Sequence, residues 1–439
     1  MKHCSWDEMA MYSDERKKKL LVVSRNFWPE KTSLTDICLH LNDLGYQTDV
    51  LCGQPSDENG EFIKGYNSFK VRRESHEKLD IFRTVDIKKG EDSNLRLYFY
   101  YISFPFFSRF LIKKIAQREY DAVLIYQTSP VMMADPGLKI ARRLNVPAYI
   151  YIAELWPERL FDVLDVRSLI FRKSLYSLSD WYYRKADALI ATSEKMKKYL
   201  SKRLSMAVRN IYMIPPFSDR RYENLIMDES LLEKMAGSFK LLIIEGRDAR
   251  LDTDSVIQAA MLIRNSRVRN IRFIVIGAGG DISELKKKVR KQSLEDMFYF
   301  EGKVSDEDMG KYLYMSDIIL CAFVPGEAGE YEASSQLIRV MAAGRPVIVT
   351  SEGTDRDIIS ESGCGIAASV QDGENLCSCI LKIYDLSQQE RQQLGAKAWN
   401  YMHDHFDPDD NARELSYILE GVSDDTPADN TGIQSLDDV

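Results

Sequence analysis

The chain has 439 residues, of which 45% are apolar and 29% charged, and its formal net charge is −8. This length exceeds one ordinary hydrophobic core and fits two or three domains, and the balance of apolar and charged residues is typical of a folded globular protein. The negative net charge excludes nucleic-acid binding by the chain as a whole, so that attraction to a polyanion has to be local.

The first residues and the cysteines predict a cytoplasmic protein. Residues 1–19 form no apolar targeting segment, and no later stretch supplies the roughly 18 uninterrupted apolar residues of a membrane span. The seven cysteines are scattered and form no C-x-x-C pair. This pattern favours reduced thiols and argues against a zinc site.

After an extension over residues 1–18, apolar runs alternate with helical patterns as far as residue 214. Residues 19–27, 34–45 and 46–53 have the patterns of a strand, a helix and a strand. Further buried strands are expected at 121–128, 147–154 and 187–193. This alternation predicts a first α/β domain, a parallel sheet covered by helices, over residues 19–214.

A polar, proline-bearing linker over residues 215–239 precedes a second alternating series over residues 240–394. Helices are expected at 395–422, and an acidic, disordered tail at 423–439. The whole is predicted to form two facing, doubly wound α/β domains. Because ligands bind outside the carboxyl ends of strands in open α/β sheets, the site is expected in a cleft between the domains.

The segment "SSQLIRVMAAGRPVIVT", residues 334–350, predicts a helix, a sharp turn and a buried strand. A helix that begins near Ser334 and Ser335 presents free backbone N–H groups, which suit a phosphate. Gly344 permits a left-handed turn, and Pro346 prevents the helix from continuing. From this segment alone, an ordinary helix-to-strand connection is the favoured interpretation.

A longer stretch, "MAAGRPVIVTSEGTDRDIISESGCGIAASVQDGENL", resembles the donor-nucleotide half of retaining glycosyltransferases of family 4, which have two Rossmann-like domains of the GT-B type. The resemblance is strongest to enzymes that add sugars, including N-acetylfucosamine, to lipid-linked precursors of bacterial surface polysaccharides such as lipopolysaccharide and capsule. "AELWPE", "FIVIGAGGDISELKK" and "LGAKAWNYMHDHF" occur in the same order as in that family, and the resemblance spans roughly residues 19–406.

This resemblance implies a nucleoside-diphosphate sugar bound mainly by the second domain, an acceptor held mainly by the first, and no metal or further cofactor. Glu154 is implied on the acceptor side and Arg247 or Arg250 at the diphosphate; these two arginines are equally well explained as solvated loop residues. The other implied donor contacts are main-chain groups at Lys303 and Val304 and the helix start at Ser335, Gln336 and Leu337.

Several positions depart from the family pattern. Arg339 stands where the family has a glutamate that accepts hydrogen bonds from the nucleotide ribose, and a guanidinium has only donors. The companion acidic position falls on Tyr331, which leaves the flanking Glu330 or Glu332 as the substitute catalytic carboxylate. Gln336 replaces a lysine that close relatives often have. These departures place catalytic turnover in question.

Two further interpretations therefore stay open. The fold is compatible with a catalytically degenerate binding or scaffold subunit that partners an active glycosyltransferase. The "GAGGD" segment at residues 277–281, with Glu301 as the acidic ribose contact, suggests an unrelated NAD-dependent enzyme, although a glycine cluster alone is a weak signal.

The composition of residues 95–118 indicates where in the cell the protein acts. This segment contains eight aromatic residues, five Lys or Arg and no acidic residue. Segments of this kind lie on anionic bilayers, where the rings enter the interface and the cations meet the headgroups. Burial of the same residues as a helix pair over the first domain is the alternative. With the implied lipid-linked acceptor, peripheral contact at the inner face of the cell membrane is the preferred prediction.

Overall fold

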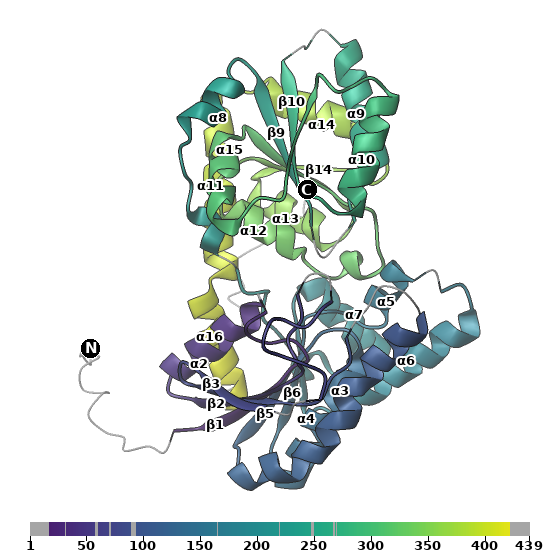
Figure 1. Cartoon of the computed structure of the whole chain (residues 1–439), viewed down its shortest axis with the longest axis vertical. Coiled ribbons are helices and arrows are strands. Elements are labelled where there is room, and N and C mark those ends of the chain that lie inside the picture. The colour runs from purple at the N-terminus through teal and green to yellow at the C-terminus, as the bar shows by residue number, and fades with distance from the viewer. Residues whose placement is uncertain are drawn as a thin grey trace, which may run out of the picture.

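The computed structural model describes residues 17–421 apart from positions 31, 58–59, 70–71, 89–93, 165, 219, 247–249, 267 and 269. Three predictions fall wholly or mostly outside the described residues: the extension over 1–18, the acidic tail over 423–439, and the diphosphate contact from Arg247. The remaining chain forms two α/β lobes, one above the other in Figure 1. The prediction of two facing α/β domains is confirmed.

The first lobe is built on an eight-stranded sheet in the order β3-β4-β2-β1-β5-β6-β7-β8. Only β3 runs antiparallel, to its neighbour β4, at the edge of the sheet. Short apolar runs buried on both faces produce the central strands, as expected for a parallel sheet covered by helices. The strands are β1 (Lys19–Val23), β2 (Gln47–Cys52), β3 (Arg72–His76), β4 (Leu79–Arg83), β5 (Ala122–Gln127), β6 (Ala148–Ile152), β7 (Ala188–Ala191) and β8 (Ile211–Met213).

Helices cover both faces of this sheet, and hydroxyl side chains mark several of their starts. Thr32, Ser168 and Ser193 each accept a hydrogen bond from a first-turn amide of the helix that follows. None of the helices in the described part of the chain is long and apolar enough to cross a membrane. The helical segments are α2 (Ser33–Asp43), α3 (Asn94–Ile115), η1 (Ala116–Arg118), η2 (Val131–Ala134), α4 (Asp135–Leu144), α5 (Glu158–Val163), α6 (Leu169–Tyr183), α7 (Glu194–Leu204) and η3 (Val208–Asn210).

The second lobe has a six-stranded, wholly parallel sheet in the order β11-β10-β9-β12-β13-β14. Its strands are β9 (Phe239–Ile244), β10 (Ile271–Ile276), β11 (Phe298–Gly302), β12 (Ile318–Ala322), β13 (Val347–Thr350) and β14 (Gly365–Ala368). Its helices are α9 (Thr253–Asn265), α10 (Gly280–Lys291), α11 (Asp306–Met315), η5 (Ala328–Glu330), α12 (Ser335–Met341), α13 (Thr354–Ser362) and α14 (Gly373–Tyr384), and η4 (Arg220–Glu223) and α8 (Glu229–Lys234) lie in the predicted linker.

The helix, turn and strand predicted at residues 334–350 are observed as α12, a turn and β13. Gly344 has φ of 60°, the left-handed conformation that ends the helical segment. β13 then enters the interior of the sheet between β12 and β14, and all four of its residues are buried. The apolar periodicity and the turn residues Gly344 and Pro346 were therefore sufficient to predict this part of the fold.

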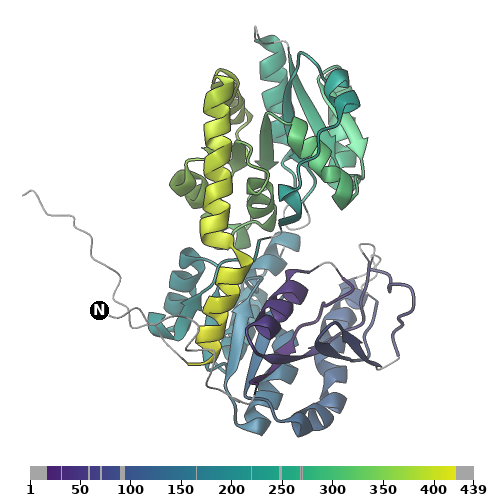
Figure 2. The ribbon, with the colours of Figure 1, turned by 90° about the vertical axis from the view of Figure 1, so that its left-hand side faces the viewer.

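The end of the described chain crosses from the second lobe back to the first. α15 (Gln388–Phe406) runs along the second lobe, and α16 (Pro408–Leu419) continues over the first, as the yellow ribbon in Figure 2 shows. Leu415 and Ile418 of α16 are buried in the core that surrounds β1. The predicted boundary at residue 394 is wrong, because it falls inside the unbroken α15.

Candidate functional site

The two lobes meet where β6 and β12 end. The loop that follows β6 and the start of α5 contact the segment 323–334 that follows β12. Leu155 donates its backbone N–H to the carboxylate of Glu332, and the guanidinium of Arg159 forms an ion pair with the same carboxylate. The carboxyl ends of the two sheets thus approach each other, which is where ligands bind in open α/β sheets.

Glu332 is a buried carboxyl at this contact, with 5% of its surface exposed. Burial raises its pKa to about 7, although Arg159 and the Leu155 amide favour the charged form. Glu154 and Asp162 of the first lobe are close enough to raise the pKa further. Glu154 was predicted on the acceptor side and Glu330 or Glu332 as the substitute carboxylate, and these roles stay predictions.

Glu154 lies two residues after the end of β6 and is held in place through both its side chain and its carbonyl. Its carboxylate accepts a hydrogen bond from the Ser129 amide at 2.8 Å, and its carbonyl accepts one from the side chain of Gln127 at 3.0 Å. Burial and the charge of Glu154 raise the pKa of the nearby Tyr101. The half-buried Glu154 carboxylate is therefore held just beyond the end of β6, and its acceptor role stays a prediction.

Glu327 and Glu330 lie on the same segment but more toward solvent. Asp162 accepts hydrogen bonds from the amides of Glu327 and Ala328 at 2.5 and 3.2 Å, and Arg172 of α6 binds the Glu327 carboxylate through contacts of 2.6 and 2.8 Å. Glu330 is exposed. Of the two carboxylates proposed from the sequence to replace the family acid, Glu332 rather than Glu330 is buried between the lobes.

Tyr331, which occupies the family's acidic position, is also an interlobe residue. Its ring stacks on Tyr199 of α7 with centroids 4.2 Å apart, and its carbonyl accepts a hydrogen bond from the Ser193 hydroxyl. Lys195, also on α7, forms an ion pair of 2.8 Å with Asp357 of α13. These contacts attach the second lobe to α7 as well as to α5 and α6.

The start of α12 differs from the open helix end that the sequence predicted. Ser334 caps the helix by accepting a hydrogen bond from the Leu337 amide at 3.4 Å, and the Ser334 amide is bound by the Asp355 carboxylate at 2.8 Å. Asp355 is 5% exposed, and burial raises its pKa to about 7. Ser335 is exposed. Two amides at this helix start therefore already have acceptors within the chain.

Gln336 and Arg339 point to the interior and the linker. The Gln336 side chain donates to the carbonyl of Ile244, at the end of β9, at 2.6 Å and is 7% exposed. The guanidinium of Arg339 lies 5.6 Å from the centre of the Tyr222 ring in η4. The residues that depart from the family pattern are thus used in packing, and their predicted donor contacts stay predictions.

The remaining predicted donor residues lie at the surface of the second lobe. Lys303 is exposed, and Val304 packs in part against the lobe's core. The Arg250 side chain is 69% exposed, with its guanidinium 3.6 Å from Asp281. The donor contacts predicted for Lys303, Val304 and Arg250 stay predictions.

The glycine-rich turn at residues 277–280 already holds an acidic side chain. The carboxylate of Glu245, which follows β9, accepts hydrogen bonds of 2.9 Å from the amides of Ala278 and Gly279. A dinucleotide pyrophosphate would have to displace this carboxylate to use the same amides. The NAD interpretation therefore loses its main structural support.

Sequence reasoning missed Arg159, which pairs with Glu332, and Asp355, which binds the Ser334 amide at the start of α12. Arg159 directly follows the quoted "AELWPE" motif, so the motif was a signal for its position but not for its partner. Asp355 has no sequence feature that identifies it as a partner of Ser334. Trp156, within the "AELWPE" motif, is 2% exposed and lies in the first lobe's core, so it is a packing residue.

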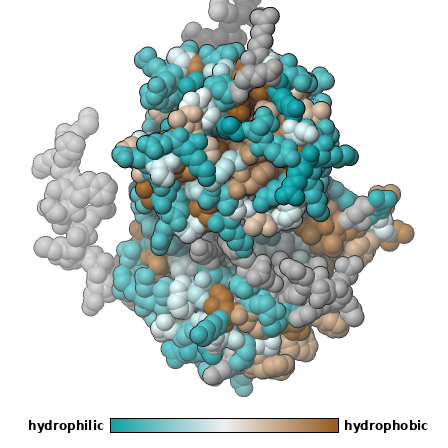
Figure 3. Space-filling model, turned by 45° about the horizontal axis from the view of Figure 1, so that its top comes forward, coloured by the Kyte–Doolittle hydropathy of each residue, from teal (hydrophilic) through white to brown (hydrophobic). Residues whose placement is uncertain are grey.

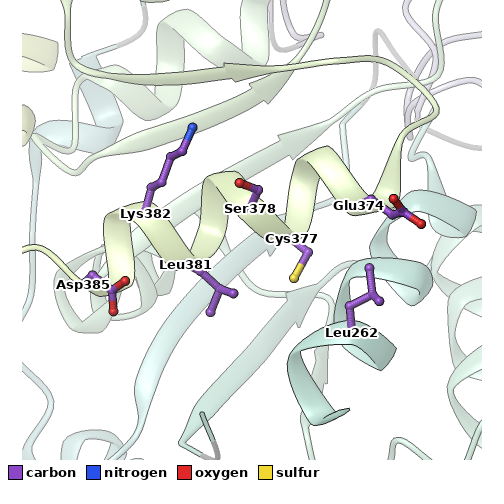
Figure 4. A pocket seen from close by; sticks show the side chains of 7 residues that line it. All are labelled: Leu262, Glu374, Cys377, Ser378, Leu381, Lys382 and Asp385. Carbon is purple, nitrogen blue, oxygen red and sulfur yellow. The ribbon is translucent and has the colours of Figure 1, made fainter. Parts of the chain in front are cut away.

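A shallow groove on the second lobe lies outside this contact. Figure 4 shows it between α9 and α14, lined by Leu262, Glu374, Cys377, Ser378, Leu381, Lys382 and Asp385. No residue of the first lobe is among these, and none of the predicted site residues is. The groove therefore has no part in the interlobe site.

Each lobe matches the model of a known protein family. Residues 31–221 match the model for Glycosyltransferase Family 4, and residues 241–385 match the model for Glycosyl transferases group 1. The two matches lie in the order that the sequence resemblance implied, one on each lobe.

Two curated relatives support this assignment. An uncharacterized glycosyltransferase of Methanocaldococcus jannaschii is 23% identical over 245 residues, which are 54% of this chain and 59% of that protein, so the chain spans less than two thirds of it. The putative colanic acid biosynthesis glycosyl transferase WcaI of Escherichia coli is 21% identical over 378 residues, which are 80% of this chain and 88% of the relative.

Solved structures share the two-lobed fold at low identity. Sucrose-phosphate synthase from Thermosynechococcus elongatus matches with a TM-score of 0.70 and 15% identity over 92% of this chain and 99% of its own. Anabaena HepE in complex with UDP matches with a TM-score of 0.64 and 12% identity over 92% of this chain and 100% of its own. These likenesses confirm the predicted GT-B architecture.

Proposed function

We propose that the chain, whose two lobes match the models for Glycosyltransferase Family 4 and for Glycosyl transferases group 1, transfers a sugar from a nucleoside-diphosphate sugar to a lipid-linked glycan, with retention of the anomeric configuration. The observation that carries the proposal is the ordered match of both lobes, combined with the contact of Leu155 and Arg159 with Glu332 where the two sheets end. The donor is the only cofactor-like molecule that the proposal requires.

In this proposal each lobe performs a separate task. Glu154, fixed by the Ser129 amide, orients the acceptor hydroxyl. Main-chain groups at Lys303 and Val304 bind the base, and Arg247 with the exposed end of α12 at Ser335 stabilises charge on the departing diphosphate. Attack occurs on the face from which the diphosphate leaves, and a leaving phosphate oxygen takes the acceptor proton. Positioning and electrostatic stabilisation then supply the rate acceleration.

The biological role proposed is assembly of a surface polysaccharide, with the chain in the cytoplasm at the inner face of the membrane. The motifs quoted above, which resemble those of N-acetylfucosamine-transferring enzymes, and the likeness to a putative colanic acid transferase support this role. Segment 95–118 is the proposed membrane contact.

A donor panel tests the activity. Calorimetry with UDP-, GDP- and dTDP-sugars, followed by assays of hydrolysis and transfer products, is expected to identify one nucleotide class that binds and turns over. Glu154→Gln is expected to reduce transfer at least about 100-fold while donor affinity stays unchanged, because the carboxylate acts on the acceptor side. Absence of binding and turnover with every donor would remove the enzyme proposal.

A non-catalytic binding or scaffold subunit, partnering an active glycosyltransferase, is the second candidate. It is favoured by the use of Glu332, Gln336 and Arg339 in internal contacts. Arg339→Glu separates the two functions: a gain in donor affinity indicates a nucleotide site that has lost its ribose contact, whereas unchanged absence of binding favours the scaffold. Turnover by the native chain excludes the scaffold.

A further inference from the structure

The solvent-facing side of α3 is apolar and basic. Phe99, Phe106 and Phe110 are 46%, 52% and 74% exposed, and Lys113 and Lys114 at the end of the helix are also exposed. The sequence contains no acidic residue from Phe99 to Arg118. An outward helix face in a soluble protein ordinarily carries charged and polar residues, so this composition indicates a partner.

The solvent-facing side of α6 has the same composition, which the sequence analysis did not predict. Its exposed large apolar residues are Leu169 at 74%, Ile170 at 82%, Phe171 at 52% and Trp181 at 50%, preceded by Val163 at 69%. Lys173 and Lys185 are exposed between and after them. The acidic residue of α6, Asp180, is bound by Arg203 at 2.9 Å.

The two helices are neighbours on one side of the first lobe. Both pack against η2, and Arg109 of α3 is close enough to Tyr182 of α6 to influence its pKa. Figure 1 shows α3 and α6 on the same outer side of the lower lobe, and Figure 3 shows hydrophobic residues gathered at the projecting right-hand edge of that lobe. We call the exposed residues of both helices, together with Val163, the α3–α6 surface.

Half of the 16 large apolar residues exposed in the described chain belong to the α3–α6 surface. The chain has a net charge of −8, yet the lysines here form a local cationic border. We propose that the α3–α6 surface docks on an anionic lipid bilayer. Its aromatic and aliphatic side chains enter the interfacial region, and the lysine ammonium groups meet the anionic headgroups.

The position of this surface fits the proposed acceptor. Arg172 of α6 also binds Glu327 of the second lobe, so the surface adjoins the interlobe contact. A protein docked there presents its acceptor lobe to a lipid-linked glycan in the same bilayer. The presentation of the acceptor lobe to a lipid-linked glycan rests on the proposed function, whereas docking on the bilayer rests on the exposure and charge of the α3–α6 surface alone.

Co-sedimentation of the full chain with vesicles tests the docking. Phosphatidylcholine vesicles with and without phosphatidylglycerol are compared at about 0.1 M and about 0.5 M salt, because added salt shortens the range of headgroup attraction. Binding is expected to be strong on anionic vesicles at low salt, to fall severalfold at high salt, and to be weak on phosphatidylcholine alone. Equal binding to both lipids, or no binding to anionic vesicles, overturns the proposal.

Two sets of substitutions separate the cationic and apolar contributions. Lys113→Gln with Lys114→Gln is expected to weaken binding about 25-fold, from about fivefold per lysine. Phe110→Ser and Ile170→Ser are each expected to weaken it about tenfold, because less apolar surface enters the interface. Phe69→Ser alters a phenylalanine that is 86% exposed outside the α3–α6 surface and is expected to leave binding unchanged.

The outcomes also distinguish other occupants and the enzyme proposal. The native chain could fail to bind vesicles and instead form a dimer that Ile170→Ser dissociates. That result would assign the α3–α6 surface to a second copy of the chain and refute bilayer docking. Vesicle binding without transfer to any acceptor supports docking and removes the proposed activity. Transfer to a soluble acceptor by a chain that does not bind vesicles would support the proposed activity and refute bilayer docking.

Discussion

The stretch from Tyr331 to Arg339, which lies between β12 and β13, has different neighbours at its two ends. Tyr331 and Glu332 lie near its start and contact the first lobe through Tyr199 and Arg159. Gln336 and Arg339 lie only a few residues later and contact β9 and the linker instead. Tyr331 and Arg339 occupy the two acidic positions of the family pattern, yet they have separate roles in this structure. Tyr331 contacts the other lobe, whereas Arg339 packs inside its own lobe against the linker.

Removal of Arg159 is expected to have the largest effect, at the interlobe end. Arg159→Ala leaves the Glu332 carboxyl, whose side chain is 6% exposed, without its charged partner. The free energy of unfolding is expected to fall by about 3 kcal/mol, measured by urea denaturation. Arg172→Ala is the control, because its partner Glu327 has a side chain 45% exposed, and a loss below about 1 kcal/mol is expected. Equal losses would contradict the contrast between buried and exposed interlobe pairs.

The internal end is tested by Gln336→Leu. The change removes the donor to the Ile244 carbonyl and leaves that buried acceptor unsatisfied. The expected loss in the free energy of unfolding is about 1–3 kcal/mol. Ser335→Ala, at the exposed neighbouring position, is expected to stay within about 0.5 kcal/mol of the native chain. An unchanged free energy of unfolding in Gln336→Leu would show that the Gln336 side chain is free to bind another partner.

Asp355 binds the amide of Ser334, which lies between the two ends. Because its carboxyl is buried, we expect the free energy of unfolding to depend on pH. Burial raises its pKa from 3.8 to about 7, so the folded protein retains a proton in this range that the unfolded chain has released. Its contribution to stability is complete below pH 3.8 and is lost as the pH rises toward 7.

Asp355→Asn is expected to remove this dependence. The difference in unfolding free energy between variant and native chain should change with pH by at most about 1.4 kcal/mol per pH unit and favour the variant near neutrality. Denaturation at several pH values from about 4 to about 7 measures it. Asp357→Asn, at the partly exposed carboxylate that pairs with Lys195, is the matched control. A difference that is flat across this range would refute the assignment.

Arg339→Met is expected to have the smallest effect on stability. Methionine keeps an apolar stem but loses the interaction with the Tyr222 ring, which contributes about 0.5–1 kcal/mol. A double-mutant cycle with Tyr222→Leu measures that coupling directly. A coupling near zero would show that Arg339 is not needed to attach α12 to the linker, and would sharpen the case for a nucleotide-facing role.

Much of the fold followed from local patterns. Buried runs such as residues 121–128 and 147–154 became β5 and β6, and Gly344 ended α12 where expected. The crossing of α16 to the first lobe was not predicted, because an amphipathic helix does not encode in its own sequence which core receives its apolar face. The predicted boundary at residue 394 falls inside α15, because the helix runs without interruption from Gln388 to Phe406.

The candidate site was predictable in outline only. Glu154 and Glu332 were named from the sequence because they follow buried strands or flank a family position. The pairing of Arg159 with Glu332 and that of Asp355 with the Ser334 amide were missed, since hydrogen bonds and ion pairs between residues far apart in sequence leave no local signal. Likewise, the apolar, basic composition of residues 95–118 was visible in the sequence, whereas its continuation onto α6 was not.

The sequence by itself determined the alternation of strands and helices, the two-domain architecture and the resemblance to glycosyltransferases, because these depend on periodicity, turn residues and short motifs. Only the tertiary structure decided which carboxylate is buried between the lobes, which amides at α12 already have acceptors, and which exposed helix faces lie together. The physical reason is that burial and charge pairing depend on distances between elements, and the same side chain serves a different role when its neighbours change.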